Sequence, residues 1–183
     1  MRKIFGLIMV MFICVFSANK VHADWGPLGP WPGGDATYTY TGFSSPDFAT
    51  HVNLAANAWT TKTDFEFTLA SSSTNAEVYV DELFVSNVDW AGLCSNYADK
   101  ETANYISSSY IIINSYYTNT YDYATTRYVI CHELGHAIGL NHRPNIYNTI
   151  MGPSVAAYMN SDGTVIFWEP QSLDIEDVND EYL

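Results

Sequence analysis

Basic side chains are scarce in this sequence of 183 residues. Lys and Arg number 7 against 20 Asp and Glu, which gives a formal net charge of 7 − 20 = −13. Nucleic-acid phosphates and anionic lipid surfaces are bound by clustered positive charge, and a composition this acidic argues against a face of that kind. We therefore expect no nucleic-acid partner and no stable membrane association.

Long apolar runs are equally few. Ile4–Phe16 is the only such run, and it is too short to span a bilayer as a permanent helix. It follows the basic pair Arg2 and Lys3 and precedes Val21–Ala23, which ends in a small residue. This is the order of a secretory signal peptide, so we predict that residues 1–23 are removed on export. The mature chain is then secreted, extracellular or periplasmic, with a charge of 4 − 20 = −16.

Cysteine is rare as well, and only Cys94 and Cys131 remain after the predicted signal peptide. In an oxidising compartment an exported pair of cysteines more often forms a disulfide than stays as two free thiols. We expect a bond between Cys94 and Cys131. The alternative for Cys131 is a small buried thiol.

The mature chain contains neither an internal repeat nor a flexible linker, so residues 24–183 are expected to form one domain. The full sequence is 48% hydrophobic, enough for a sizeable core. Runs of β-branched and aromatic residues alternate with segments of helical periodicity. The expected elements are strands at 37–41, 65–69, 78–84, 93–97 and 110–114, and helices at 45–60, at 126–140 and from 172 onwards.

Tyrosine is abundant, and seven tyrosines lie close together before and at the start of the second expected helix. Such residues line some substrate clefts, but packing between neighbouring strands is their more frequent role, and we favour packing here. They are Tyr105, Tyr110, Tyr116, Tyr117, Tyr121, Tyr123 and Tyr128.

Histidine is concentrated in one short segment, which holds His132, His136 and His142. Two histidines four apart in a helix project from the same face, about 6 Å apart, which suits two ligands of a tetrahedral zinc ion. Gly139 allows the helix to stop and the chain to turn, so that His142 approaches the same ion. Three imidazoles leave a fourth position open, as in catalytic zinc sites. His51, in the first expected helix, is more simply a packed or surface residue.

Glu133 is adjacent to the first of these ligands and one turn short of the second. It therefore reaches the ion's neighbourhood without being a ligand. Zn²⁺ lowers the pKa of bound water and polarises a carbonyl group. Glu133 can then act as the general base that takes the water proton and passes it to the leaving amine. The competing interpretation is a surface helix whose histidines are only solvated.

The segment His132–His142 resembles the signature HExxHxxGxxH of the metzincin clan of zinc metallopeptidases. Thr149–Pro153 resembles that clan's Met-turn, with Met151 beneath the metal, and its Met-x-Pro form is most similar to the matrixins. Asp174 matches the aspartate of the matrixins' last helix that supports the Met-turn. The resemblance implies an α+β, metzincin-like (zincin) domain. Its mixed, twisted sheet would carry three helices, the active-site helix being followed by the Met-turn and the C-terminal helix.

The same resemblance implies a zinc endopeptidase acting on protein or peptide substrates, which we expect to be a monomer. Residues 91–97 would lie near the edge strand that pairs with an extended substrate, and residues 153–157 would form the wall of the primed side. The alternatives are a non-catalytic binding module, and a zinc hydrolase that acts on chain termini or non-peptide amides.

The sequence departs from the matrixin pattern at several points. Arg143 follows the third histidine, where many matrixins have a small hydroxyl residue. No tyrosine stands two residues after Met151, where astacin-like enzymes have one. No EF-hand-type loop is present, although the many carboxylates leave room for structural Ca²⁺.

Overall fold

The computed structural model describes residues 26, 28–41, 47–98, 104–143, 148–154 and 158–183. The predicted signal peptide, residues 1–23, lies outside the described residues. So do Ser45 and Pro46, where the first helix was expected to start.

A five-stranded mixed sheet forms one layer of the domain, with the strand order β2-β1-β3-β5-β4. Four strands run parallel, whereas β4 is antiparallel to β5 at one edge. All five strands occur where the sequence pattern predicts them. They are β1 (Asp35–Thr41), β2 (Glu66–Leu69), β3 (Val78–Leu83), β4 (Gly92–Tyr97) and β5 (Ser108–Asn114).

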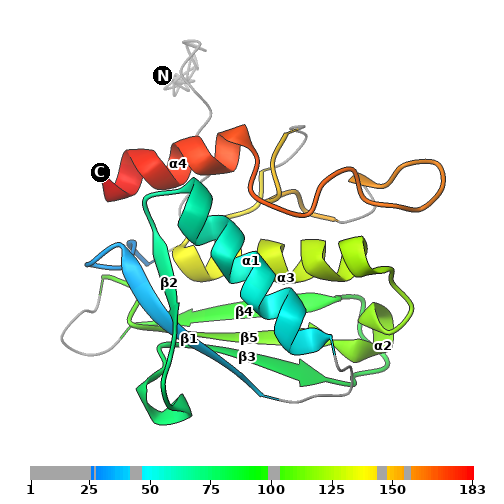
Figure 1. Ribbon diagram of the computed structural model, residues 1–183, viewed down its shortest axis with the longest axis horizontal. Helices are drawn as coiled ribbons and strands as arrows, with labels where there is room; N and C mark the ends of the chain where they lie inside the picture. The colour runs from blue at the N-terminus through cyan, green and yellow to red at the C-terminus, as the bar shows by residue number, and fades with distance from the viewer. Residues whose placement is uncertain (1–25, 27, 42–46, 99–103, 144–147, 155–157) are drawn as a thin grey trace, which may run out of the picture.

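Helices α1 (Phe48–Lys62) and α3 (Tyr123–Ile138) cover one face of this sheet, and α4 (Ser172–Tyr182) lies beyond them (Figure 1). The three helices predicted from periodicity are therefore confirmed. A single helical turn, α2 (Ser115–Thr118), and a 3₁₀ turn at Ser73–Asn75 were not predicted.

The hydrophobic core lies between α1, α3 and the sheet. Inward-facing residues of the central strands, such as Val80, Ile111 and Ile113, have no exposed surface, as the two-residue period of a strand requires. Trp59 on α1 is also fully buried, and its indole N–H donates a hydrogen bond of 3.0 Å to the Cys131 carbonyl on α3. This packing fixes α3, the helix that carries the predicted zinc ligands, over the β4 side of the sheet.

The expected disulfide between Cys94 and Cys131 is wrong, because both cysteines are free thiols. Cys131 is completely buried in the core. Cys94, on β4, instead lines a cavity together with Glu133. At about 100° per residue, Cys131 and Glu133 point to nearly opposite sides of α3. The helix itself therefore separates the two thiols, and the alternative of a small buried thiol holds for Cys131.

Candidate metal centre

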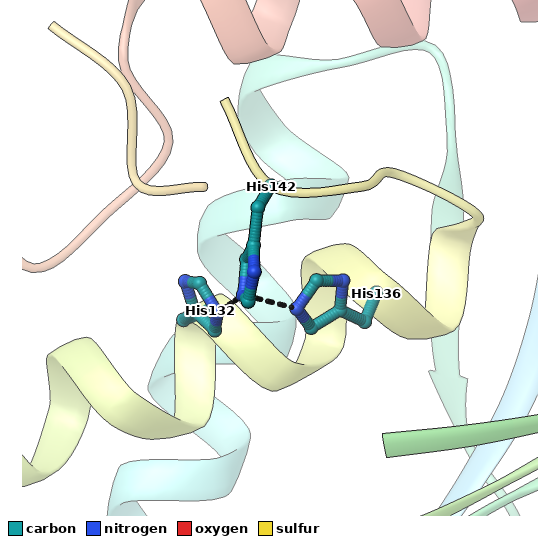
Figure 2. A group of neighbouring side chains, drawn as sticks. All are labelled: His132, His136 and His142. Carbon is teal, nitrogen blue, oxygen red and sulfur yellow. Dashed lines mark hydrogen bonds between the residues drawn. The ribbon is translucent and has the colours of Figure 1, made fainter. Parts of the chain in front are cut away.

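Three histidine side chains converge at the C-terminal end of α3 (Figure 2). His132 and His136 project from one face of the helix, and His142 returns from the segment that follows it. Nε2 of His142 lies 3.1 Å from Nε2 of His132 and 3.1 Å from Nε2 of His136. Two nitrogens on a tetrahedral zinc ion at about 2.05 Å are themselves separated by about 3.3 Å. The structure therefore brings together the three residues that the sequence predicts, at a spacing that suits one ion.

The second ring nitrogens of two of these histidines fix the tautomers. Nδ1 of His132 is 2.7 Å from the Ile150 carbonyl oxygen, and Nδ1 of His136 is 2.7 Å from that of Leu140. A carbonyl oxygen only accepts, so each Nδ1 carries the proton and each Nε2 presents a lone pair. Burial lowers the pKa of His132 to about 3 and that of His136 to about 4, which keeps both rings neutral. The Nε2 lone pairs of His132 and His136 both face Nε2 of His142, and a set of three imidazole nitrogens at this spacing fits a zinc ion.

Gly139 ends α3 in the way the sequence predicts. Its φ of 119° and ψ of −2° lie in the left-handed region, where a glycine has no side chain to strain. Its backbone N–H donates to the His136 carbonyl at 3.0 Å, and the N–H of Leu140 donates to the Gly135 carbonyl at 3.1 Å. This sharp reversal carries the chain back over the helix and delivers His142 to the other two histidines.

The carboxylate of Glu133 lies beside the histidines and against the start of β4. The residue is buried, and this burial raises its pKa to about 8. A methyl group placed on Gly92 would lie 2.5 Å from Oε1 of Glu133, so a side chain at this position would displace the carboxylate. The sequence offered Glu133 as a candidate base but gave no reason to single out Gly92.

The predicted Met-turn lies beneath the histidines and is tied to α4. The carboxylate of Asp174, which is fully buried, accepts a hydrogen bond of 2.7 Å from the N–H of Ile150 and another from the hydroxyl of Thr149. Met151 is also fully buried, with its sulfur directly against Gly135 of α3. Asp174 thus contacts the Met-turn, at the position the matrixin resemblance indicated.

Arg143 has a structural place that the sequence did not reveal. Its side chain is only 2% exposed and pairs with Asp177 of α4, which is equally buried. Its backbone N–H donates to the Met151 carbonyl at 2.7 Å. Arg143 therefore links the segment just after His142 to the Met-turn and to α4. No local sequence signal could have identified a partner 34 residues away.

Two cavities of about 390 Å³ each flank the histidines, and Gly92, Glu133 and His142 line both of them. The first cavity lies on the His136 side. It is also lined by Gly26, Leu28, Leu93, Cys94, Asn96, Gly139, Leu140 and Asn141. Asn96 crosses from β4 to α3, because its side-chain amide donates to the His136 carbonyl at 2.7 Å.

The second cavity lies on the His132 side and is rich in tyrosine. It is also lined by Asp89, Trp90, Ala91, Tyr117, Tyr121, Tyr128, Val129, Gly152, Pro153 and Ser154. Three of the seven clustered tyrosines therefore face a cleft, so packing is not their only role. Two of their hydroxyls donate to backbone carbonyls: that of Tyr117 to Val88, and that of Tyr128 to Ile150 at 3.1 Å.

His51 takes no part in this centre. It is 5% exposed, with its ring 4.2 Å from that of Tyr123. Of the two roles that the sequence left open, packed or surface residue, the structure shows the packed one. In the part of the chain that the structure describes, His132, His136 and His142 form the only group of histidine, cysteine and carboxylate atoms close enough to hold an ion.

Comparisons with known proteins agree with this site. A family model described as "Dual-action HEIGH metallo-peptidase" matches residues 36–162. The fold is similar to that in a crystal structure of myroilysin, with a TM-score of 0.55, 14% identity, and coverage of 84% of this chain and 85% of that one. A second myroilysin structure gives a TM-score of 0.51 at 14% identity and covers 81% of this chain and 92% of that one. No curated protein sequence matches. These structural likenesses concern the fold alone, and they confirm the metzincin-like architecture.

Proposed function

Because this chain belongs to the dual-action HEIGH metallopeptidase family, we propose that it is a secreted zinc endopeptidase that cleaves internal bonds of proteins or peptides. That it is a zinc metallopeptidase follows from the family and from the histidine triad. The endopeptidase action, the export and the roles of individual residues are our proposals. The observation that carries the proposed catalytic roles is the convergence of three imidazoles beside one buried carboxylate.

His132, His136 and His142 would hold the zinc ion, which would supply a Lewis acid able to acidify water and polarise the substrate carbonyl. Glu133 takes the proton from the attacking water and later delivers it to the nitrogen of the departing amine. Burial supports this role, because it raises the pKa of Glu133 to about 8 in the metal-free protein and so makes the carboxylate a stronger base. A cation beside Glu133 works against that rise, because it favours the carboxylate.

The shape of the cleft supports an extended peptide as substrate. In the described part of the chain, β4 pairs with β5 alone, so its other edge is available to main-chain hydrogen bonds from a substrate. The two cavities lie on either side of Glu133 and His142, and each can receive side chains from one side of the cleaved bond. A cleft that continues past the reacting position in both directions suits cleavage within a chain.

Export and partners complete the proposal. The charge and apolar pattern of residues 1–23 supports secretion. Among the helices that the structure describes, none is long and apolar enough to cross a bilayer. We propose a monomer that binds neither nucleic acid nor lipid, as the net charge of −13 favours, and light scattering of the purified protein tests the monomer. We include structural Ca²⁺ in the proposal, and elemental analysis of the purified protein tests whether calcium is bound.

The decisive experiment is a cleavage profile on a peptide library, read by mass spectrometry, with the wild type and with Glu133→Gln. We expect internal cuts by the wild type and none by the variant, while zinc content stays the same in both. Glu66→Gln is the matched control, because Glu66 is an exposed carboxylate on β2, remote from the cleft in the sheet order. Cuts confined to chain termini would favour the trimming hydrolase, and a zinc-loaded protein without any cleavage would favour the binding module.

A further inference from the structure

The carbonyl group of Ile150 accepts two hydrogen bonds that both come from α3. One is from Nδ1 of His132 at 2.7 Å, and the other is from the hydroxyl of Tyr128 at 3.1 Å. Tyr128 precedes His132 by one helical turn, so the two side chains lie on the same face of α3. Their rings are 6.1 Å apart and 23° from parallel. Both lone pairs of this carbonyl are thereby used, and its direction is fixed from two points on one helix.

The two metal-binding histidines of α3 are oriented in different ways. His136 donates to Leu140, four residues further along the same chain reversal. His132 donates to Ile150, 18 residues away on the Met-turn. The orientation of the His132 ring therefore depends on how firmly the Met-turn is held against α3. The carboxylate of Asp174 accepts a hydrogen bond from the N–H of Ile150, and the hydroxyl of Tyr128 donates one to the carbonyl of the same residue.

Tyr128 is well placed for such a role. It is 2% exposed and packs against Tyr158, with ring centroids 5.7 Å apart, and against Phe167 at 6.4 Å. A side chain confined in this way presents its hydroxyl in one direction. Outer hydrogen bonds of this kind set the tautomer and direction of a metal-binding imidazole and tune the affinity for the metal.

We propose that Tyr128 is a positioning residue for the zinc site. Its hydroxyl holds the Ile150 carbonyl in line with Nδ1–H of His132, so that Nε2 of His132 points at the metal position. This inference rests on the proposed zinc site and adds to it a residue that acts on the metal position through His132.

Tyr128→Phe removes the hydroxyl and keeps the ring. We expect the zinc dissociation constant to rise about tenfold, the lower end of the effect of removing such a partner. The measurement is competition of the metal-free protein with a chromogenic chelator for zinc. The visible spectrum of the Co²⁺-loaded protein is a second readout, in which we expect a shift of the ligand-field bands because one imidazole changes its direction.

Tyr117→Phe is the matched control. Tyr117 lines the same cavity, and its hydroxyl also donates to a backbone carbonyl, but that carbonyl belongs to Val88 and contacts no histidine. We expect its zinc affinity and cobalt spectrum to equal those of the wild type. An equal loss in both variants would overturn the proposal, because a general softening of the cavity would then explain the result.

Site-specific replacement of Tyr128 by 4-aminophenylalanine keeps a donor at the same point and should restore most of the zinc affinity. If Tyr128→Phe does not fold, this replacement and 3-fluorotyrosine at position 128 still vary the donor strength at constant shape, and zinc affinity should follow it. If zinc affinity and the cobalt spectrum do not change with the donor at position 128, the role of Tyr128 is overturned, but the zinc site is not. A wild-type protein that binds no zinc would overturn the zinc site itself.

Discussion

Replacing Gly92 by alanine tests how closely the edge strand approaches the proposed general base. The added methyl carbon would lie 2.5 Å from Oε1, 2.6 Å from Cγ and 2.8 Å from Cδ of Glu133. Because unstrained carbon contacts begin at about 3.5 Å, the carboxylate must retreat by about 1 Å. A displacement of that size costs about 100-fold in rate when it moves a catalytic group, which is about 2.7 kcal/mol in activation free energy.

We therefore expect kcat/KM of Gly92→Ala to fall about 100-fold, with zinc content unchanged because the three atoms nearest to the new methyl group all belong to Glu133. The assay is hydrolysis of a quenched fluorescent peptide, with zinc measured by mass spectrometry and folding by circular dichroism. Ser95→Ala is the control, since alternation along β4 places position 95 on the face opposite to Gly92. A Gly92→Ala enzyme that keeps more than half of the wild-type kcat/KM would refute the reasoning, and so would one that loses its zinc.

Three further outcomes are expected. Asp177→Asn removes the negative charge that pairs with the buried guanidinium of Arg143, and it should lower the free energy of unfolding by about 3–5 kcal/mol in urea titrations. An effect below about 1 kcal/mol, typical of exposed pairs, would contradict the burial. In the metal-free protein Glu133 has a folded-state pKa of about 8, raised above its unfolded value of 4.5, so its protonated form stabilises the fold at low pH and this contribution is lost as pH rises. Wild type should thus lose up to about 1.4 kcal/mol per pH unit relative to Glu133→Gln between about pH 5 and 8, and parallel stability curves would refute this. His132 and His136 titrate in the opposite sense, because their folded-state pKa values are lowered, so the metal-free protein should lose stability as pH falls below about 6.5. Zinc should be released in acid, since protonated imidazoles do not bind it. Unchanged zinc content down to about pH 4 would contradict this release.

Local geometry explains why most of the metal centre could be predicted. The spacing of His132 and His136 is a property of any α-helix, and the left-handed turn at Gly139 needs only a glycine in the right place. The helix boundary was less accurate: α3 begins at Tyr123, three residues before the predicted start, because the side chain of Asp122 caps it by accepting from the Thr125 N–H at 2.6 Å. Asp122 lies within a polar connector, so its capping role was not distinguishable from the sequence.

Long-range contacts explain what could not be predicted. The compartment argument for a disulfide took no account of the rotation of α3, which turns Cys131 into the core and away from Cys94. The pairing of Arg143 with Asp177 and the donation from Tyr128 to Ile150 join residues 34 and 22 positions apart. The more specific resemblance to matrixins, made on the Met-turn and the last helix, stays a prediction.

The sequence by itself determined the zinc ligands, the candidate base and the succession of strands and helices along the chain, because each depends on spacing within a few residues. Only the tertiary structure decided how the ligands are held. It showed the Met-turn carbonyl that orients His132, the buried carboxylate of Asp174 behind it and the close approach of Gly92 to Glu133. These contacts depend on how α3, β4 and α4 pack together, and packing is a property of the whole fold that no segment of sequence contains.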